Sequence, residues 1–404
     1  MSDVERVFRE EWSRVLAILV SVLGDFDLAE DAAADAFAGA AERWPREGTP
    51  RNPGAWLVTT ARNRAIDRLR RTRTLERKTE LLARLAELPA DEEDVSSIPD
   101  ERLALVFTCC HPALSEEARV ALTLREVGGL TTREIARALL ASEPATAQRL
   151  VRAKRKIREA GIPFRIPPDE LLPERVRSAL AVLYLVFNEG YAATAGDALV
   201  RGDLCEEAIR LAKLLAVLMP DEAEALGLLA LMLLHDARRE ARTDAGGALI
   251  LLTDQDRSLW NRERIAEGER VLERALSLRL PGPYQLQAAI AALHCASTAA
   301  ETDWPQISAL YGALARVAPS SVVELNRAVA VAMAAGPEEG LELIDRIEGL
   351  EGYHLLHAAR ADLLRRLGRG AEAVSAYGEA LALATNDAER AYLGRMLTAV
   401  QSRE

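Results

Sequence analysis

The sequence has few aromatic residues and few signs of β-structure. Only 4% of its 404 residues are Phe, Trp or Tyr, and no stretch shows the alternation of β-branched and polar residues that marks a strand. The chain is rich in Ala, Leu, Arg and Glu instead, and these residues favour helices. We therefore predict an all-α fold, with two or three domains at this length.

Long apolar runs and abundant cysteines are also missing. No run reaches the length of a membrane span, and the first residues, MSDVERVFREEW, are acidic and amphipathic where a signal peptide would need a cationic start and an apolar core. These features predict a cytoplasmic protein with no membrane partner. The four cysteines are too few for a disulfide framework, so reduced thiols are expected.

Cys109, Cys110 and His111 are adjacent potential metal ligands. A structural zinc site would need a second ligand pair nearby, at C-x2-C or H-x3-H spacing, and none follows. We expect buried thiols here, and neither a metal nor another cofactor. No nucleophile and base pair or phosphate-binding loop is evident, so the sequence does not predict an enzyme.

The charges are distributed unevenly along the chain. They balance over residues 1–165, whereas residues 166–404 carry the whole formal net charge of -11. An acidic protein is ordinarily a poor candidate for binding nucleic acid. Here, however, the excess of acid lies outside the part that holds the basic helices.

Residues 130–158, LTTREIARALLASEPATAQRLVRAKRKIR, are typical of a helix-turn-helix. Thr131 and Glu134 can form a capping box at the start of a short helix. Ser142 is a favoured N-cap for a second helix, and Pro144 is tolerated in its first turn. Projected at 100° per residue, the second helix has an apolar side with Ala147, Leu150, Val151 and Ile157. Its opposite side carries Gln148, Arg149, Arg152, Arg155 and Lys156.

That basic side has two interpretations. A run of charge is usually the solvated face of a surface helix. Between Leu130 and Arg165, however, nine basic residues stand against three acidic ones. A short helix, a tight turn and a basic second helix together favour contact with DNA phosphates and base edges.

Two further helices are predicted upstream. The first begins with Asp27, Glu30, Asp31 and Asp35, which either stabilise the helix dipole or form an acidic face for a basic partner protein; the residues leave both open. A loop over residues 46–54 precedes the second helix, residues 55–71. This helix has Trp56 near its start, and its polar side carries Asn63, Asp67, Arg70 and Arg71.

Three segments in order resemble the two conserved domains of bacterial extracytoplasmic-function sigma factors, the specificity subunits of RNA polymerase. They are DLAEDAAADAFAGAAERWP, NPGAWLVTTARNRAIDRLRR and GLTTREIARALLASEPATAQRLVRAKRKI. The resemblance implies a region 2 domain over residues 1–80 and a region 4 helix-turn-helix domain over residues 102–165. It also implies core RNA polymerase and promoter DNA as partners.

The resemblance assigns expected roles to residues. The helix with Asp27, Glu30, Asp31, Asp35 and Phe37 would bind the clamp helices of the polymerase largest subunit. The loop 46–54, with Trp56, Asn63, Asp67, Arg70 and Arg71, would hold the melted strand of the minus-10 element. The recognition helix, with Thr146, Gln148, Arg149, Arg152, Arg155 and Lys156, would read the minus-35 duplex, and region 4 would meet the polymerase flap.

The rest of the chain reads as a linker and a repeat domain. Residues 81–101 are polar and acidic, either a solvated spacer or, as the family implies, a segment in the RNA path of the polymerase. Residues 168–404 read as helical pairs, clearest over residues 353–387, where Ala373, Tyr377 and Ala380 take the small, aromatic and small positions of a tetratricopeptide repeat (TPR). Such an extension resembles a sigma-factor subgroup with a TPR-like C-terminal domain.

Two polar clusters in this region stand beside apolar runs. They are Asn188, Glu189 and Tyr191, and Asp254, Asp256, Trp260 and Arg262. A buried hydrogen-bond network is favoured over a ligand site, although a regulatory protein or ligand could act at the repeats.

The sequence thus predicts a sigma factor with a regulatory helical-repeat domain. The alternative is a polymerase-independent helix-turn-helix regulator with a TPR-like sensor. Such a regulator would not need the helix at residues 55–71 and its preceding loop, and their presence favours the sigma factor.

Overall fold

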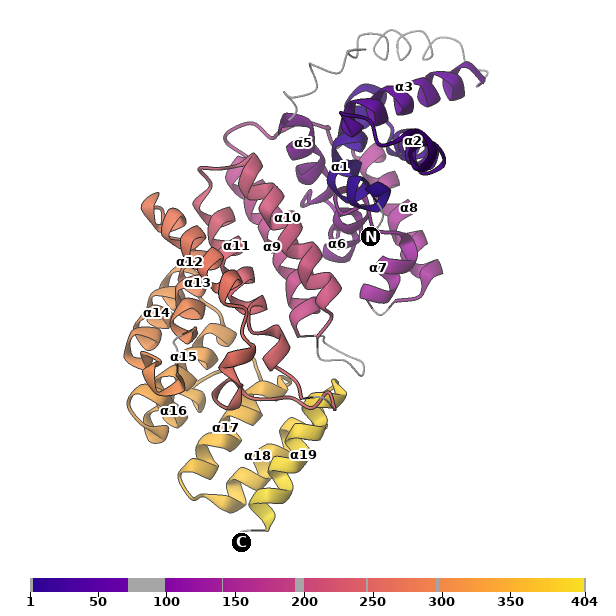
Figure 1. Cartoon of the computed structure of the whole chain (residues 1–404). Coiled ribbons are helices and arrows are strands. Elements are labelled where there is room, and N and C mark those ends of the chain that lie inside the picture. Colours follow the sequence, from indigo (N-terminus) through magenta and orange to yellow (C-terminus); the bar gives the residue numbers. More distant parts are fainter. Residues whose placement is uncertain are drawn as a thin grey trace. The chain divides into compact units, whose positions relative to one another are not determined.

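The computed structural model describes residues 3–71, 99–139, 141–192, 200–244, 246–295 and 298–402. Across these ranges the regular structure is helical and no strand is present, apart from an isolated bridge between Thr243 and Leu249. The all-α prediction is confirmed (Figure 1). The chain divides into two compact units, Met1–Leu185 and Val186–Glu404. Most of the predicted linker, residues 81–101, lies outside the described residues.

The first unit begins with three helices that pack on one another: α1 (Asp3–Leu23), α2 (Phe26–Glu47) and α3 (Pro53–Arg71). Asp25 begins α2, because its side chain accepts a hydrogen bond from the Leu28 amide at 3.1 Å. The buried face of α2 consists mostly of alanines, which allow the neighbouring helices to approach closely. Phe37 completes this face, and its ring packs against Phe8 at 4.9 Å and Trp12 at 5.8 Å between centroids.

The second half of this unit contains α5 (Pro99–Cys109), α6 (Glu116–Leu122), a π-helical turn η1 (Thr123–Val127), α7 (Thr132–Ala138) and α8 (Glu143–Glu159). Cys109 and Cys110 are buried, as expected. Gly129, in the turn after η1, has φ +74, and a Cβ built there would meet the Trp12 ring at 3.0 Å. Only glycine allows this turn to lie so close to α1, and the contact ties the two halves of the unit together.

Helix α9 (Leu172–Tyr191) contains the boundary between the two units. Its first half belongs to the first unit, where Ser178 donates a hydrogen bond to the Cys110 carbonyl at 2.6 Å and accepts one from Arg119 at 2.7 Å. The change of character predicted at residues 166–168 coincides with the loop between α8 and α9. The compact unit nevertheless continues through Leu185.

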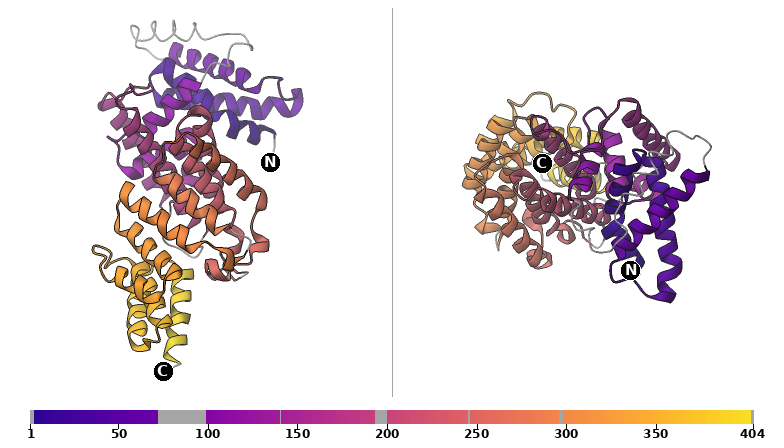
Figure 2. Two further views of the ribbon diagram at one scale, coloured as in Figure 1. Left: turned by 90° about the vertical axis from the view of Figure 1, so that its left-hand side faces the viewer. Right: turned by 90° about the horizontal axis from the view of Figure 1, so that it is seen from above.

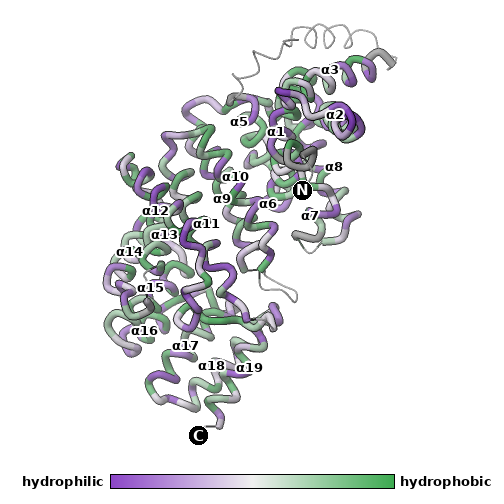
Figure 3. Tube along the Cα trace, viewed as in Figure 1, coloured by the Kyte–Doolittle hydropathy of each residue, from purple (hydrophilic) through white to green (hydrophobic). Residues whose placement is uncertain are grey.

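The second unit consists of helices that pack in consecutive pairs (Figure 2). They are α10 (Gly202–Leu218), α11 (Ala223–Asp236), α12 (Arg262–Ser277), α13 (Pro283–His294), α14 (Trp304–Val317), α15 (Ser321–Ala334), α16 (Pro337–Ile344), α17 (His354–Arg366), α18 (Gly370–Leu383) and α19 (Asp387–Gln401). Short 3-10 turns lie at Arg239–Ala241, Leu252–Asp254, Arg257–Leu259 and Ala299–Glu301. Hydrophilic and hydrophobic residues interleave along the trace (Figure 3), as expected of amphipathic helices. Helix α11 differs, because nearly all its residues are buried among α10, α12 and α13.

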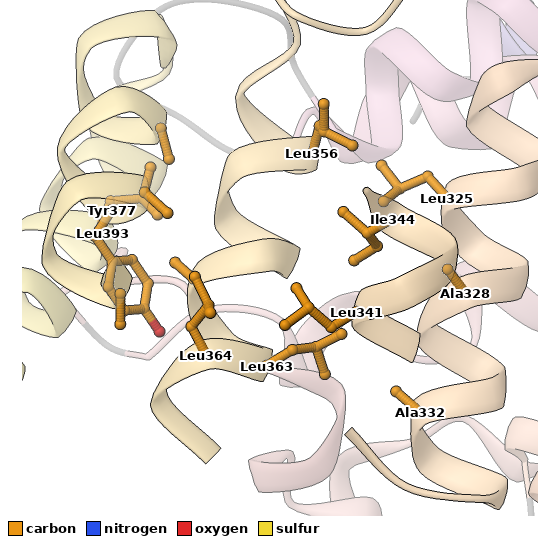
Figure 4. Close-up of a cluster of buried hydrophobic side chains, with 14 of the residues drawn as sticks. Leu325, Ala328, Ala332, Leu341, Ile344, Leu356, Leu363, Leu364, Tyr377 and Leu393 are labelled. Carbon is orange, nitrogen blue, oxygen red and sulfur yellow. The ribbon is translucent and has the colours of Figure 1, made fainter. Parts of the chain in front are cut away.

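The last helices of the second unit share one apolar core (Figure 4). Tyr377 of α18 and Leu393 of α19 lie beside Leu364 of α17, while Leu341 and Ile344 of α16 lie between α15 and α17. Ala373, Tyr377 and Ala380, predicted at the small, aromatic and small positions of a repeat, are all buried. The predicted helical hairpins are therefore present at this end of the chain.

Within the described ranges, no helix is long and apolar enough to cross a membrane.

Candidate nucleic-acid and polymerase-binding surfaces

The helix-turn-helix forms from the capping residues that the sequence indicated. The Thr131 amide donates to Glu134 Oε2 at 2.8 Å, and the Glu134 amide donates back to Thr131 Oγ1 at 3.2 Å. This reciprocal pair is a capping box at the start of α7. Ser142 begins α8 by accepting from the Ala145 amide at 3.3 Å, so the position of the recognition helix is set by local contacts.

The outward face of α8 is basic, as predicted, but its phase differs slightly from the prediction. Gln148, Arg152, Arg155 and Lys156 are exposed and Arg149 is partly exposed. The buried stripe runs through Thr146, Leu150, Ala153 and Ile157. The expected apolar residue Val151 is 66% exposed, because the stripe lies about one residue away from the projected position.

Thr146 does not lie on the DNA-facing side as expected. Its side chain is 0% exposed, and Oγ1 donates to the Ser142 carbonyl at 3.1 Å. A buried hydroxyl that is already bonded cannot reach a base edge. Of the residues predicted to contact duplex DNA, the exposed or partly exposed ones are Gln148, Arg149, Arg152, Arg155 and Lys156.

The predicted single-strand surface lies on α3. Asn52 accepts from the Ala55 amide at 3.1 Å and begins the helix. Trp56 packs edge-on against Trp44, with ring centroids 5.4 Å apart, and remains partly exposed, while Asn63 and Asp67 are exposed. The side chains of Arg70 and Arg71 lie outside the described part of the structure.

The acidic residues of α2 are divided between two sets of cations. Arg68 of α3 holds Asp31 at 2.5 Å and Asp35 at 2.8 Å. Asp27 and Glu30, one turn earlier, face the region 4 half instead. Phe37 was expected to contact the polymerase, but it is buried in the core of the three-helix half, so it supports the surface rather than forming it.

A network of charged side chains, buried at Glu126 and open to solvent at Asp27, joins α2 to the region 4 half. Lys154 of α8 is 11% exposed and lies against Glu30, with its Nζ also 3.2 Å from Glu126 and 3.4 Å from Asp27. Arg125 of the π-helical turn donates to Glu30 at 2.5 Å and to the Leu130 carbonyl at 3.1 Å. The network therefore connects a predicted polymerase-binding acid to the recognition helix.

Burial and neighbouring charges act against each other in this network. Glu126 is 0% exposed; burial, with repulsion from Glu30, outweighs the attraction of Lys154 and raises the pKa of Glu126 to about 7. Burial also opposes ionisation of Glu30, but Lys154 and Arg125 outweigh it and lower the pKa of Glu30. The pKa of Lys154 is raised, because the carboxylates outweigh its burial. The lysine is therefore held charged between two acids of different proton affinity.

Lys154, Arg125 and Glu126 were not singled out from the sequence. Lys154 stands among five other cations of the same helix, and only its distance of four residues from buried Leu150 places it on the inner side. Glu126 lies in a π-helical turn, where the ordinary helical projection fails. No pattern of local spacing could have paired Lys154 with Glu30, which is far away in the sequence.

Comparisons with known proteins agree with this architecture. Family models described as Sigma-70 region 2 and Sigma-70, region 4, match residues 7–74 and 104–157, and a family of unknown function (DUF6596) matches residues 175–276. An uncharacterized protein of Rhizobium meliloti (strain 1021), R00370, is 47% identical over 392 residues, covering 95% of this chain and 92% of the relative. No solved structure matches the chain.

The chain belongs to the sigma-70 family, whose two DNA- and polymerase-associated regions it carries in order. More particularly, it is an extracytoplasmic-function-like sigma factor with a C-terminal helical extension that includes the DUF6596 domain. Its role is therefore in transcription initiation.

Proposed function

We propose that the chain directs core RNA polymerase to specific two-part promoters and helps to melt them, and that its C-terminal helical unit regulates this activity. The observation that supports the proposal best is the basic outward face of α8, in a chain with region 2 and region 4 in the order of a sigma factor. The C-terminal unit would take a TPR-like role as a platform for a regulatory partner.

Promoter recognition would be shared between two surfaces. Arg149 and Arg152 of α8 would contact base edges of the minus-35 duplex, since arginine can bind guanine through two hydrogen bonds. Arg155 and Lys156 would neutralise phosphates. On α3, Trp56 and the exposed Asn63 would hold the melted minus-10 strand by stacking and hydrogen bonding.

Polymerase binding would begin at the more exposed acids of α2. Among the described residues Asp31 and Asp35 are held by Arg68 at the surface, and such exposed ion pairs are weak. Glu30 is held by Lys154 and Arg125 inside the unit. A basic partner would therefore engage Asp31 and Asp35 first and would reach Glu30 only after region 4 has moved away.

Transcription in vitro tests the proposal. Purified protein and core polymerase are incubated with a library of genomic fragments, and we expect initiation at discrete promoters. Replacing both Arg149 and Arg152 by Ala should reduce specific transcripts about 100-fold, since each base contact contributes roughly 1–3 kcal/mol of discrimination. Arg346→Ala, which removes an exposed cation in the turn after α16, should leave transcription unchanged.

Two outcomes would refute the proposal. One is the absence of initiation from any fragment of the library. The other is equally tight binding of promoter fragments with and without core polymerase, which would indicate a polymerase-independent regulator.

A further inference from the structure

Three arginines of the second unit gather around aromatic rings in the segment between α11 and α12. The Arg257 and Arg238 guanidinium carbons lie 4.5 Å and 5.9 Å from the centre of the Trp260 ring. Arg242 lies over Tyr191 at 3.8 Å. Arg238, Arg242, Arg257 and Trp260 lie in the connection after α11, and Tyr191 is the last residue of α9.

Neighbouring arginines in the same region are neutralised by acids, which gives a direct comparison. Arg239 pairs with Asp236 at 3.0 Å and Glu206 at 3.2 Å. Arg264 pairs with the same two carboxylates. Asp236 and Glu206 are therefore already engaged by two other cations.

Arg238 and Arg242 have no ion pair with a carboxylate among the described residues. Arg238 is 5% exposed, and its Nε finds no hydrogen-bond partner in the described part of the chain. Arg242 donates to the Tyr191 carbonyl, which carries no net charge. A guanidinium stays ionised in proteins, and a buried charge without a counter-charge is strongly unfavourable. Within the described ranges, therefore, no carboxylate partner neutralises these two guanidinium groups.

The surrounding histidines add hydrogen-bond donors without adding acids. Burial and the charge of Arg238 lower the pKa of His235. Burial, with Arg238 and Arg257, lowers the pKa of His294 to about 4. Both imidazoles are therefore neutral at pH 7, and each retains one N–H. These two imidazoles therefore supply no counter-charge for the arginines.

We propose that Arg238 and Arg242, with Arg257 beside them, form a binding site for a phosphate group. Planar guanidinium groups recognise phosphate oxygens through paired hydrogen bonds, and two or more cations suit a ligand with two negative charges. The phosphate could be free or the terminal group of a small metabolite. All the residues of the site lie in the C-terminal unit.

The two acids once considered for this region do not belong to the site. Asp254 and Asp256 are exposed, and Asp256 serves as the N-cap of a 3-10 turn by accepting from the Ser258 amide at 2.9 Å. Glu189 pairs with Arg201 at 2.9 Å. The expected hydrogen-bond network is thus present in part, and among the described residues it includes no carboxylate bound to Arg238 or Arg242.

Calorimetric titration of the full-length protein with inorganic phosphate, in chloride-balanced buffer, tests the proposal. We expect saturable binding with one site per chain, and a rise in melting temperature. Arg238→Gln and Arg242→Gln should each weaken binding tenfold or more. Arg270→Gln, an exposed cation of α12, is the matched control and should bind as the wild type does.

A parallel titration with glycerol phosphate distinguishes a free phosphate ion from the terminal phosphate of a small metabolite. Tighter binding of glycerol phosphate supports the terminal group of a metabolite, and tighter binding of inorganic phosphate supports the free ion. Absence of saturable binding by both, or equal binding by Arg238→Gln and the wild type, would overturn the site.

A second variant distinguishes a ligand site from a structural arginine. Arg238→Met keeps the bulk of the side chain and removes its charge. In phosphate-free buffer the variant should melt at or above the wild-type temperature, and phosphate should raise the melting temperature of the wild type alone. A lower melting temperature for the variant in phosphate-free buffer would show that the protein itself satisfies Arg238, against the proposal. These measurements involve no transcription, so their failure leaves the proposed function intact.

Discussion

Both units bury cations, but they neutralise them differently. In the first unit Lys154 lies between Glu30 and Glu126, acids that come from α2 and from the π-helical turn. In the second unit Arg238 and Arg242 stack on aromatic rings, and no described carboxylate pairs with them. The first arrangement contains its own counter-charges, whereas the second has none among the described residues, and under our proposal a bound phosphate supplies them.

The difference indicates what each region responds to. A complete network holds two elements together, and it can be opened only by a partner that offers replacement charges. An incomplete one is stabilised by any anion that fits it. The first unit should therefore respond to a macromolecule, and the second to a small molecule.

Removing the central cation of the first unit should have the largest effect. Lys154→Met leaves the buried Glu126 without its cation, and the loss of one partner of a buried pair costs about 3–5 kcal/mol. Lys156→Met, two residues away on the exposed face, should change the free energy of unfolding by less than about 0.5 kcal/mol. Urea unfolding measures the change in the free energy of unfolding for each variant, and hydrogen exchange of the α2 and α8 amides shows whether the loss is located at this contact. Equal effects of the two variants would contradict the network.

Glu126 should make the first unit sensitive to pH. Its pKa is raised to about 7 in the folded protein from a model value of 4.5, so the folded state binds the extra proton and loses stability as the pH rises from 4.5 to 7. Glu126→Gln removes this loss. Between pH 4.5 and pH 8, the difference in unfolding free energy should shift by about 3 kcal/mol in favour of the variant.

The control for this experiment is Glu170→Gln, at an exposed position before α9. It should follow the wild-type pH profile. A Glu126→Gln profile parallel to the wild type would show that Glu126 is already ionised in the folded state at pH 4.5.

Two glycine-to-alanine substitutions should measure how tightly the two halves of the first unit pack at the turn after η1. Gly129 and Gly161 both have positive φ, so alanine strains either position by about 1 kcal/mol. Only at Gly129 would the Cβ also meet Trp12, which should add about 1–2 kcal/mol. Urea unfolding of both variants gives this difference. Equal losses of unfolding free energy in the two variants would mean that the Trp12 side chain moves aside without an energetic penalty.

Local signals predicted much of the fold. The capping box at Thr131 and Glu134, the N-cap at Ser142 and the buried positions Ala373 and Tyr377 depend on residues within a turn or two of one another. Such contacts are encoded by spacing alone. For the same reason the sequence located the recognition helix and its basic face.

Contacts between segments that are distant in the chain could not be predicted from the sequence. Thr146 and Val151 exchanged their expected sides, because the buried stripe is set by the helices that pack on α8 rather than by its own composition. Lys154 and Lys156 look alike in the sequence, yet one is buried against α2 and the other is exposed. The arginine cluster brings together the end of α9 and the connection between α11 and α12. No periodic pattern in the sequence relates these two segments.

Helix α9 limits where this protein can be divided. Its first half carries Ser178, which bonds to the Cys110 carbonyl and to Arg119 beneath the recognition domain. A chain ended at residue 168 would lose these bonds and uncover the Cys110 side of α5, so its inactivity would say nothing about regulation. A chain that continues through Leu185 keeps them. A useful truncation of this protein therefore ends inside α9 rather than before it, because the first half of α9 is part of the compact unit that contains region 4.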